Sequence, residues 1–175
     1  YTSFVRMYFQ RTFDGMLATP LSVEEIIIAE ICWAASKSAA AVTLMLAVLV
    51  PIGYANFPGA LMCIPIAFLG GLAFGAIGMV FTGIIPSIDM FNLPIFLFIT
   101  PMFLFSGTFF PVSGIPEWAG IFTLVFPLYH LVELTRYFCI GAMESHPAFN
   151  LAYLGLFAAL FSYLAIWAMK RRLVK

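Results

Sequence analysis

The sequence predicts an all-α protein that crosses a membrane several times as a helix bundle. Of its 175 residues, 63% are hydrophobic and only 9% are charged, and the mean hydropathy is +1.06, whereas soluble domains are roughly 45–50% apolar. No Asp, Glu, Lys or Arg occurs between Lys37 and Asp89, or between Glu144 and Lys170. Because one spanning helix needs about 20 apolar residues, the first stretch has room for two spans and the second for one.

Turn-forming residues divide the chain into four predicted spans, at residues 22–50, 59–84, 93–106 and 148–169. Ser22 and Glu25 have the spacing of a capping box, which marks a helix start. Gly70, Gly71, Gly75, Gly78 and Gly83 predict close contact between the second span and neighbouring helices. We expect Pro94 and Pro101 to kink the third span. Residues 1–10 are interpreted as the end of a preceding span, so that residues 1–175 form one transmembrane domain.

The position of the basic residues predicts the orientation of the spans. Arg6 and Arg11 lie near the start of the chain, and Lys170, Arg171, Arg172 and Lys175 lie near its end. Because Lys and Arg are enriched on the cytoplasmic side of membrane proteins, we expect both ends of this segment in the cytoplasm. Four spans satisfy that arrangement, and they place residues 51–58 and 107–144 on the outer side.

The region of residues 105–136 is apolar but contains residues that interrupt a spanning helix. They are Gly107, Pro111, Gly114, Pro116 and Pro127. Irregular backbone at membrane depth occurs only where protein or a water-filled cavity satisfies its polar groups. We therefore expect residues 107–144 to form an external re-entrant helical hairpin, which enters the bilayer and returns to the same side.

Three polar side chains follow one another at helical spacing within this apolar region. Glu133 and Arg136 are three residues apart and can pair on one helix face, and His130 precedes Glu133 by one turn. Charged groups at membrane depth cost about 2.5–3.5 kcal/mol on insertion scales, so they indicate a functional site. The alternative is an ion pair at the level of the lipid headgroups that only anchors a short helix.

Residues 11–20 predict a short amphipathic helix on the cytoplasmic side. Phe13, Met16 and Leu17 recur at helical spacing, Arg11 and Asp14 are polar, and Pro20 ends the pattern. Such a helix can bind a partner protein, or it can rest on lipid headgroups. The acidic residue and the lack of a basic face favour the partner slightly.

The sequence contains no pattern typical of an enzyme. A phosphate-binding GxxxxGK[ST] loop is absent, so the 175 residues cannot form a P-loop ATPase. The two histidines are too isolated for a zinc site, and no serine or cysteine nucleophile has a plausible base. We interpret Cys32, Cys63 and Cys139 as small buried hydrophobic residues. We therefore predict no catalytic, metal-binding or cofactor-binding residues, and no binding to nucleic acid.

Two segments resemble the permease subunits of ABC type-2 exporters, especially the branch that exports nodulation factors, polysaccharides and some drugs. RTFDGMLATPLSVEEI, at residues 11–26, is similar to the cytoplasmic coupling helix of that family and the span that follows it. FSGTFFP, IPEW and FPLYHLVELTR, at residues 105–111, 115–118 and 126–136, are similar to its external re-entrant hairpin. The family's first span and preceding amphipathic helix have no counterpart here.

The resemblance implies a multi-pass permease of the inner (cytoplasmic) membrane that works as a dimer with a second, identical permease copy. It implies that ATP and Mg²⁺ bind to a separate cytoplasmic ABC ATPase subunit. The residues expected to contact that ATPase are Arg11, Phe13, Asp14, Met16, Leu17, Thr19 and Pro20. The residues expected to form the re-entrant gate are Gly107, Phe110, Pro111, Pro116, Pro127, His130, Glu133 and Arg136.

The implied function is export of an amphiphilic substrate, such as a lipo-oligosaccharide or a polysaccharide precursor. Two alternatives involve transport as well: a drug efflux permease of the same family, and a carrier or channel that does not use ATP. A membrane enzyme or a structural scaffold is a third alternative. A co-purifying ATPase would separate the exporter from the carrier, and an enzyme would need a catalytic constellation.

Overall fold

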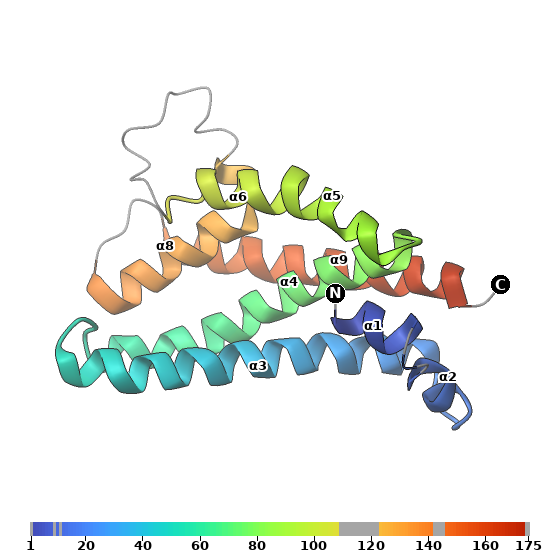
Figure 1. Cartoon of the computed structure of the whole chain (residues 1–175). Coiled ribbons are helices and arrows are strands. Elements are labelled where there is room, and N and C mark those ends of the chain that lie inside the picture. Colours follow the sequence, from blue (N-terminus) through green and yellow to red (C-terminus); the bar gives the residue numbers. More distant parts are fainter. Residues whose placement is uncertain (1, 9, 11, 109–122, 142–145, 174–175) are drawn as a thin grey trace.

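A computed structural model of the chain describes residues 2–8, 10, 12–108, 123–141 and 146–173. Within these ranges the secondary structure is helical and contains no strand. Four helical segments are long and apolar enough to cross a membrane: Val23–Ile52, Gly59–Ile84, Ile88–Phe105 and Pro147–Leu173. The all-α transmembrane bundle predicted from the sequence is therefore confirmed (Figure 1).

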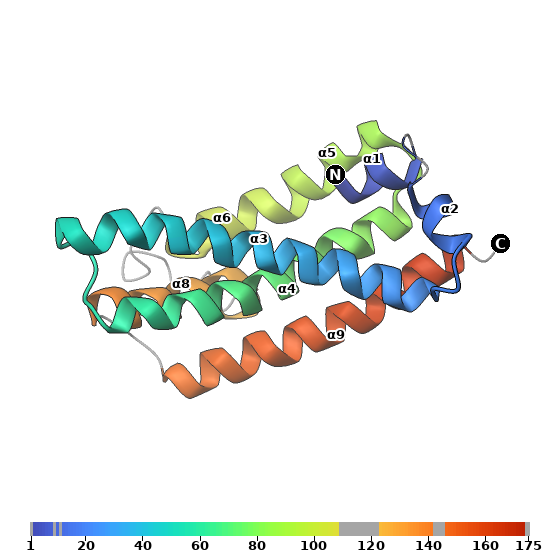
Figure 2. The same cartoon turned by 90° about the horizontal axis from the view of Figure 1, so that it is seen from below.

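Helix α4 (Cys63–Ile84), which follows the 3₁₀ turn η1 (Gly59–Met62), packs against α3 (Val23–Ile52), α8 (Pro127–Ile140) and α9 (Pro147–Leu173). Figures 1 and 2 show the long helices running together along the bundle. Glycines of α4 permit this close packing, because a Cβ on Gly71 would lie 2.6 Å from the Ala35 Cα, and one on Gly83 2.9 Å from the Ala168 Cβ. Gly78 is an exception, since a Cβ there would meet nothing within 4 Å.

The third span is a series of short helical segments. These are η2 (Ile88–Phe91, 3₁₀), α5 (Asn92–Pro94), η3 (Ile95–Ile99, a π-helix) and α6 (Thr100–Phe105). Pro94 and Pro101 lack the N–H that an α-helical ladder needs, and the hydrogen-bonding pattern changes between them. The α-helical hydrogen-bond pattern is therefore replaced by a π-helical one between the two prolines, and a kink of the span stays a prediction.

The observed helices extend beyond several of the expected spans. α3 continues through Pro51 to Ile52 and ends where Gly53 adopts a left-handed conformation (φ 85°). The third helical segment begins at Ile88 instead of residue 93, and Phe91, expected in a polar connection, is buried. α9 continues to Leu173 through the basic residues, whose charges are favourable at a helix C-terminus.

Three shorter helices occupy the two ends of the bundle. α1 (Thr2–Tyr8) and α2 (Thr12–Leu17) lie at the end where α9 finishes, and both chain termini are marked on that side (Figures 1 and 2). α8 lies toward the opposite end, beside the start of α4 and the start of α9. Its 14 residues span about 21 Å at 1.5 Å per residue, too short to cross the roughly 30 Å apolar layer of a bilayer.

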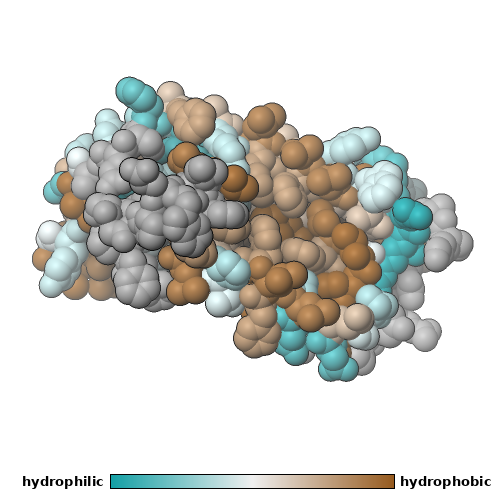
Figure 3. Space-filling model, turned by 90° about the horizontal axis from the view of Figure 1, so that it is seen from above, coloured by the Kyte–Doolittle hydropathy of each residue, from teal (hydrophilic) through white to brown (hydrophobic). Residues whose placement is uncertain are grey.

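The surface of the bundle is strongly apolar. Leu97 of η3 is 82% exposed and Leu156 of α9 is 74% exposed. Hydrophobic residues cover much of the middle of the face in Figure 3, and hydrophilic residues gather toward its ends. This distribution suits a protein surrounded by lipid, with its polar ends at the two interfaces.

Candidate functional site

The short helix α2 is attached to the bundle by its apolar side chains. Phe13 is 1% exposed and belongs to a core cluster with residues of α1, α3, α4 and α9, among them Ile27, Met79 and Met169. Met16 packs on the edge of the same cluster. The Phe13 ring therefore faces the spans. A partner that binds α2 would act on Phe13 by displacing α2, the helix that Phe13 anchors to the bundle.

The opposite side of α2 and the turn after it are open. Gly15, Ala18, Thr19 and Pro20 are exposed, and the Thr19 hydroxyl and backbone N–H both donate to the Met16 carbonyl. Arg11 and the side chains of Asp14 and Leu17 lie outside the described residues. Contact between an ATPase and this surface stays a prediction; of the residues predicted to make it, Thr19 and Pro20 are exposed.

Helix α1 is joined to α3 by a partly buried ion pair. The Arg6 guanidinium donates to Glu30 Oε1, and the Ser3 hydroxyl donates to Glu30 Oε2 over 3.1 Å. The Glu30 side chain is 8% exposed and that of Arg6 is 28% exposed. The sequence carries no spacing signal for the pairing of Glu30 with Arg6, so this is a contact that sequence reasoning missed.

The start of α3 and the end of α9 are joined at the same end of the bundle. The predicted capping box is present: Ser22 Oγ accepts from the Glu25 N–H over 3.3 Å, and Glu25 Oε2 accepts from the Ser22 N–H over 2.7 Å. Lys170 of α9 donates to the Glu24 carboxylate, and both side chains are about half exposed. α3 therefore begins at a fixed point beside the basic end of α9.

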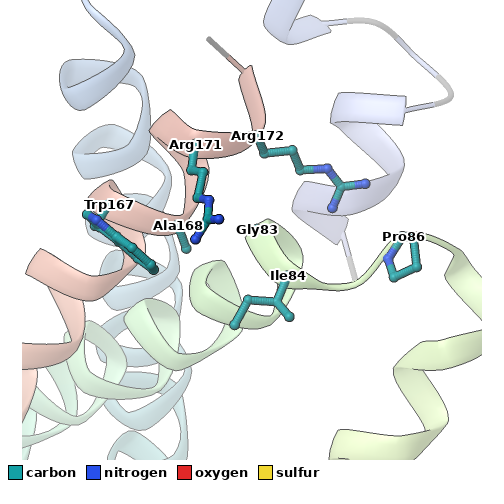
Figure 4. Close-up of a pocket in the computed structure, with 7 residues that line it drawn as sticks. All are labelled: Gly83, Ile84, Pro86, Trp167, Ala168, Arg171 and Arg172. Carbon is teal, nitrogen blue, oxygen red and sulfur yellow. The ribbon is translucent and has the colours of Figure 1, made fainter. Parts of the chain in front are cut away.

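Arg172 connects α9 to two other helices. Its guanidinium donates to the carbonyls of Thr82 and Ile85 at the end of α4 and lies 5.3 Å from the ring centre of Phe4 in α1. Beside it is a pocket of about 410 Å³ between the ends of α4 and α9, shown in Figure 4. Seven residues line it: Gly83, Ile84, Pro86, Trp167, Ala168, Arg171 and Arg172. The contacts at this end of the bundle thus link α1 and α2 to the three long helices α3, α4 and α9.

At the other end of the bundle, α8 forms for local reasons that are visible in its sequence. Pro127 is at the first helical position, where its missing N–H is not needed, and Phe126 before it is extended. Gly141 ends the helix with a left-handed φ of 77°. The other predicted gate residues Phe110, Pro111 and Pro116 lie outside the described residues, so the first arm of the expected hairpin stays a prediction.

A buried polar cluster joins α8 to α9. His130 is fully buried; its Nδ1 lies 2.7 Å from Asn150 Oδ1, and its Nε2 lies 2.9 Å from the Leu124 carbonyl oxygen. The Tyr153 ring lies against the imidazole with ring centres 4.0 Å apart, and its hydroxyl donates to the Val125 carbonyl over 2.6 Å. Both nitrogens of the imidazole are therefore held, one by the helical turn at residues 123–125 and one by α9.

The two charged residues of α8 lie together near the end of α6. Glu133 is 2% exposed, and its Oε1 lies 3.9 Å from Arg136 Nη1. Arg136 also donates to the carbonyl of Gly107, which is buried and has a φ of 76°. Gly107, Glu133 and Arg136, which the sequence placed in one gate, are thus in contact. Glu133 is buried in protein while the Arg136 side chain is 36% exposed, and both the gate and the headgroup anchor stay predictions.

Sequence reasoning missed the two residues of α9 that contact His130. Asn150 is fully buried and Tyr153 covers His130. A single amide in an otherwise apolar span was a usable signal, because polar side chains within a membrane mostly face other protein. The residues predicted to contact the ATPase do not contact those predicted to form the gate, because α2 and α8 lie at opposite ends of the bundle (Figures 1 and 2).

Comparison with known proteins identifies relatives over the whole chain. The model of the ABC-2 type transporter family matches residues 1–140. Nodulation protein J of Sinorhizobium fredii is 34% identical over 174 residues, which are 99% of this chain and 66% of the relative. Nodulation protein J of Bradyrhizobium diazoefficiens is 34% identical over 175 residues, or 100% and 67% of the two chains.

The nodulation protein J of Rhizobium meliloti is 32% identical over 174 residues, again 99% of this chain and 66% of the relative. The chain therefore spans about two thirds of the length of these relatives. No solved structure matches it significantly.

Proposed function

This chain belongs to the ABC-2 type transporter family, and on that premise we propose that it is the membrane-spanning permease subunit of an ATP-driven exporter. A separate cytoplasmic ABC ATPase subunit binds and hydrolyses ATP, because the 175 residues contain no phosphate-binding loop. A second permease copy completes the pathway, and the inner membrane is the site of action. The end that carries α1 and α2 faces the cytoplasm.

The observation that supports this function best is the attachment of α2. Phe13 enters a cluster to which α1, α3, α4 and α9 all contribute, while the far side of α2 is open to a partner. Because packed interiors transmit displacement with little compression, a push on the exposed side of α2 reaches three long helices together. α2 therefore acts as the coupling helix.

The outer end provides the other part of the mechanism. α8 lies in the half of the bundle opposite α2, which is the outer half in the proposed orientation, and is held by His130 to α9 and by Arg136 to the end of α6. Buried polar side chains such as these bind specific partners, and they can exchange one partner for another. Side chains that face lipid make no such specific contacts. We assign to α8 and residues 107–126 the role of an outer gate that opens when the spans tilt.

The substrate proposed for this exporter is amphiphilic, such as a lipo-oligosaccharide or a polysaccharide precursor. The support is the resemblance to the branch that exports such molecules and the similarity to proteins named nodulation protein J. A substrate with an apolar tail can remain in the lipid that covers the exposed apolar faces of α3 and α9.

The partner assignment is tested with the full-length protein, expressed together with ABC ATPase subunits from its own genome and purified through a tag. Gly15 is a suitable probe because it is exposed and a Cβ there meets nothing within 4 Å. Gly15→Trp adds bulk on the docking side only, and Gly15→Ala is the matched control. We expect an ATPase subunit to co-purify in equal amount with the wild type and Gly15→Ala, and to be lost from Gly15→Trp.

The same preparations test transport. In inverted membrane vesicles, wild-type protein is expected to take up a labelled lipo-oligosaccharide only when ATP is present, and Gly15→Trp is expected to take up none. Purification of the wild type without any ATPase, or ATP-independent uptake, would favour a carrier or channel. ATP-dependent uptake of a hydrophobic dye but not of the glycolipid would identify a drug exporter.

A further inference from the structure

Two cysteines that are 76 residues apart in the sequence meet at the outer end of the bundle. Cys63 begins α4 and Cys139 lies in the last turn of α8, and their Sγ atoms are 3.2 Å apart. Cys63 is 2% exposed, and Cys139 is partly exposed. Both cysteines are free thiols in the structure, and their sulfur atoms lie within hydrogen-bonding distance of each other.

The backbone on both sides of this pair is held in place. The Asn56 N–H donates to the Cys139 carbonyl over 2.8 Å, which fixes the end of α8 against the connection between α3 and η1. Gly59 lies so close to Phe138 that an added Cβ would overlap the Phe138 carbonyl. The approach of the two sulfurs therefore follows from the packing of two helix ends, and does not depend on the rotamer of one side chain alone.

We propose that Cys63 and Cys139 form a disulfide that joins α8 to α4 at the outer end of the protein. A disulfide needs an S–S distance of about 2.05 Å, so the sulfurs must approach by roughly 1 Å. Disulfides persist in the oxidising compartments outside the cytoplasm, which is where the proposed orientation places this pair. The inference depends on that orientation, but it does not depend on ATP or on the substrate.

The oxidant is a disulfide-bearing thiol oxidoreductase of the outer compartment. The more accessible Cys139 thiolate attacks a sulfur of the oxidant's disulfide, which gives a mixed disulfide and releases one oxidant thiolate. The Cys63 thiolate then attacks Cys139 Sγ, forms the Cys63–Cys139 bond and releases the second. Two cysteine thiols are oxidised, and the two electrons and two protons end on the oxidant as a dithiol.

The bond would restrict how the outer end can open. α8 would be fixed to α4 at its C-terminal end, while near its N-terminal end His130 is held to α9 by a non-covalent contact. Movement of the gate would then take place by tilting of α8 about the Cys63–Cys139 bond. Complete separation of α8 from α4 would be excluded.

The test is differential alkylation of the full-length protein in intact cells with an oxidising periplasm. The protein is denatured in the presence of N-ethylmaleimide so that buried free thiols are blocked as well. It is then purified, its disulfides are reduced, and the new thiols receive iodoacetamide. Mass spectrometry then reads each cysteine. We expect iodoacetamide on Cys63 and Cys139 in most molecules, and N-ethylmaleimide on Cys32, which is an exposed free cysteine of α3 and an internal reference.

A Cys63→Ser variant identifies the partner. If the two cysteines are bonded to each other, Cys139 of this variant will carry N-ethylmaleimide. The proposal is overturned if both wild-type cysteines carry N-ethylmaleimide in most molecules, or if Cys139 still carries iodoacetamide in Cys63→Ser. ATPase co-purification is measured on the same samples, so that loss of the disulfide with the ATPase retained leaves the proposed function intact.

Discussion

Replacing Gly71 with alanine is expected to force α3 and α4 apart. The added Cβ would lie 2.6 Å from the Ala35 Cα and 2.9 Å from the Ser38 Cβ. Carbon atoms in contact are about 3.5–4.0 Å apart, so the helices must separate by roughly 1 Å. A clash with backbone cannot be relieved by a change of rotamer, and overpacking of this kind costs about 1–3 kcal/mol.

Gly78→Ala is the matched control, because Gly78 is on the same helix and a Cβ there meets nothing within 4 Å. Alanine improves helix propensity at both positions by about 1 kcal/mol. That gain cancels in the comparison, and the difference between the two variants reports the packing of α3 on α4. We expect Gly71→Ala to be less stable than Gly78→Ala by about 1–3 kcal/mol.

The assay is unfolding of the purified protein in mixed detergent micelles, driven by SDS and followed by helix content and tryptophan fluorescence. A difference of about 1–3 kcal/mol corresponds to roughly a 5- to 150-fold change in the folding equilibrium. If the two variants unfold at the same SDS concentration, α3 and α4 do not approach each other at Gly71 as described.

Two further predictions concern the polar contacts at the two ends. In the same unfolding assay, a double-mutant cycle of Arg6→Ala and Glu30→Ala should give a coupling energy of about 1 kcal/mol. This value is lower than for a fully buried ion pair, because the Arg6 side chain is 28% exposed. Additive effects of the two substitutions would contradict the pairing. Asn150→Ala should destabilise the protein by about 1–3 kcal/mol, because buried His130 loses a partner, whereas the exposed Leu151→Ala should change stability by less than about 0.5 kcal/mol.

Local patterns were sufficient for much of the fold. The uncharged stretch after Lys37 predicts two spans because charges are costly in lipid, and the Ser22–Glu25 spacing predicts a helix start because both partners lie within one turn. Pro94 and Pro101 predict an irregular third span for an equally local reason, the loss of a backbone donor, and a π-helical segment lies between them.

The contacts that define the two candidate sites were not predictable in this way. Arg6 pairs with Glu30 only because α1 folds back against α3, and His130 meets Asn150 only because α8 lies against α9. The same holds for Cys63 and Cys139, whose 76-residue separation carries no spacing signal. Among the glycines of α4, the sequence also could not tell Gly78, which has open space, from those at helix contacts.

The central claim is that α2 and α8 lie on opposite sides of the membrane, the first as a cytoplasmic coupling helix and the second as part of an outer gate. Thr19 and His146 are both exposed and mark the two ends. In a variant without native cysteines, Thr19→Cys and His146→Cys are labelled separately in spheroplasts with a membrane-impermeant maleimide. The account predicts that His146→Cys is labelled at once and Thr19→Cys only after permeabilisation, and labelling of both from the same side would contradict it.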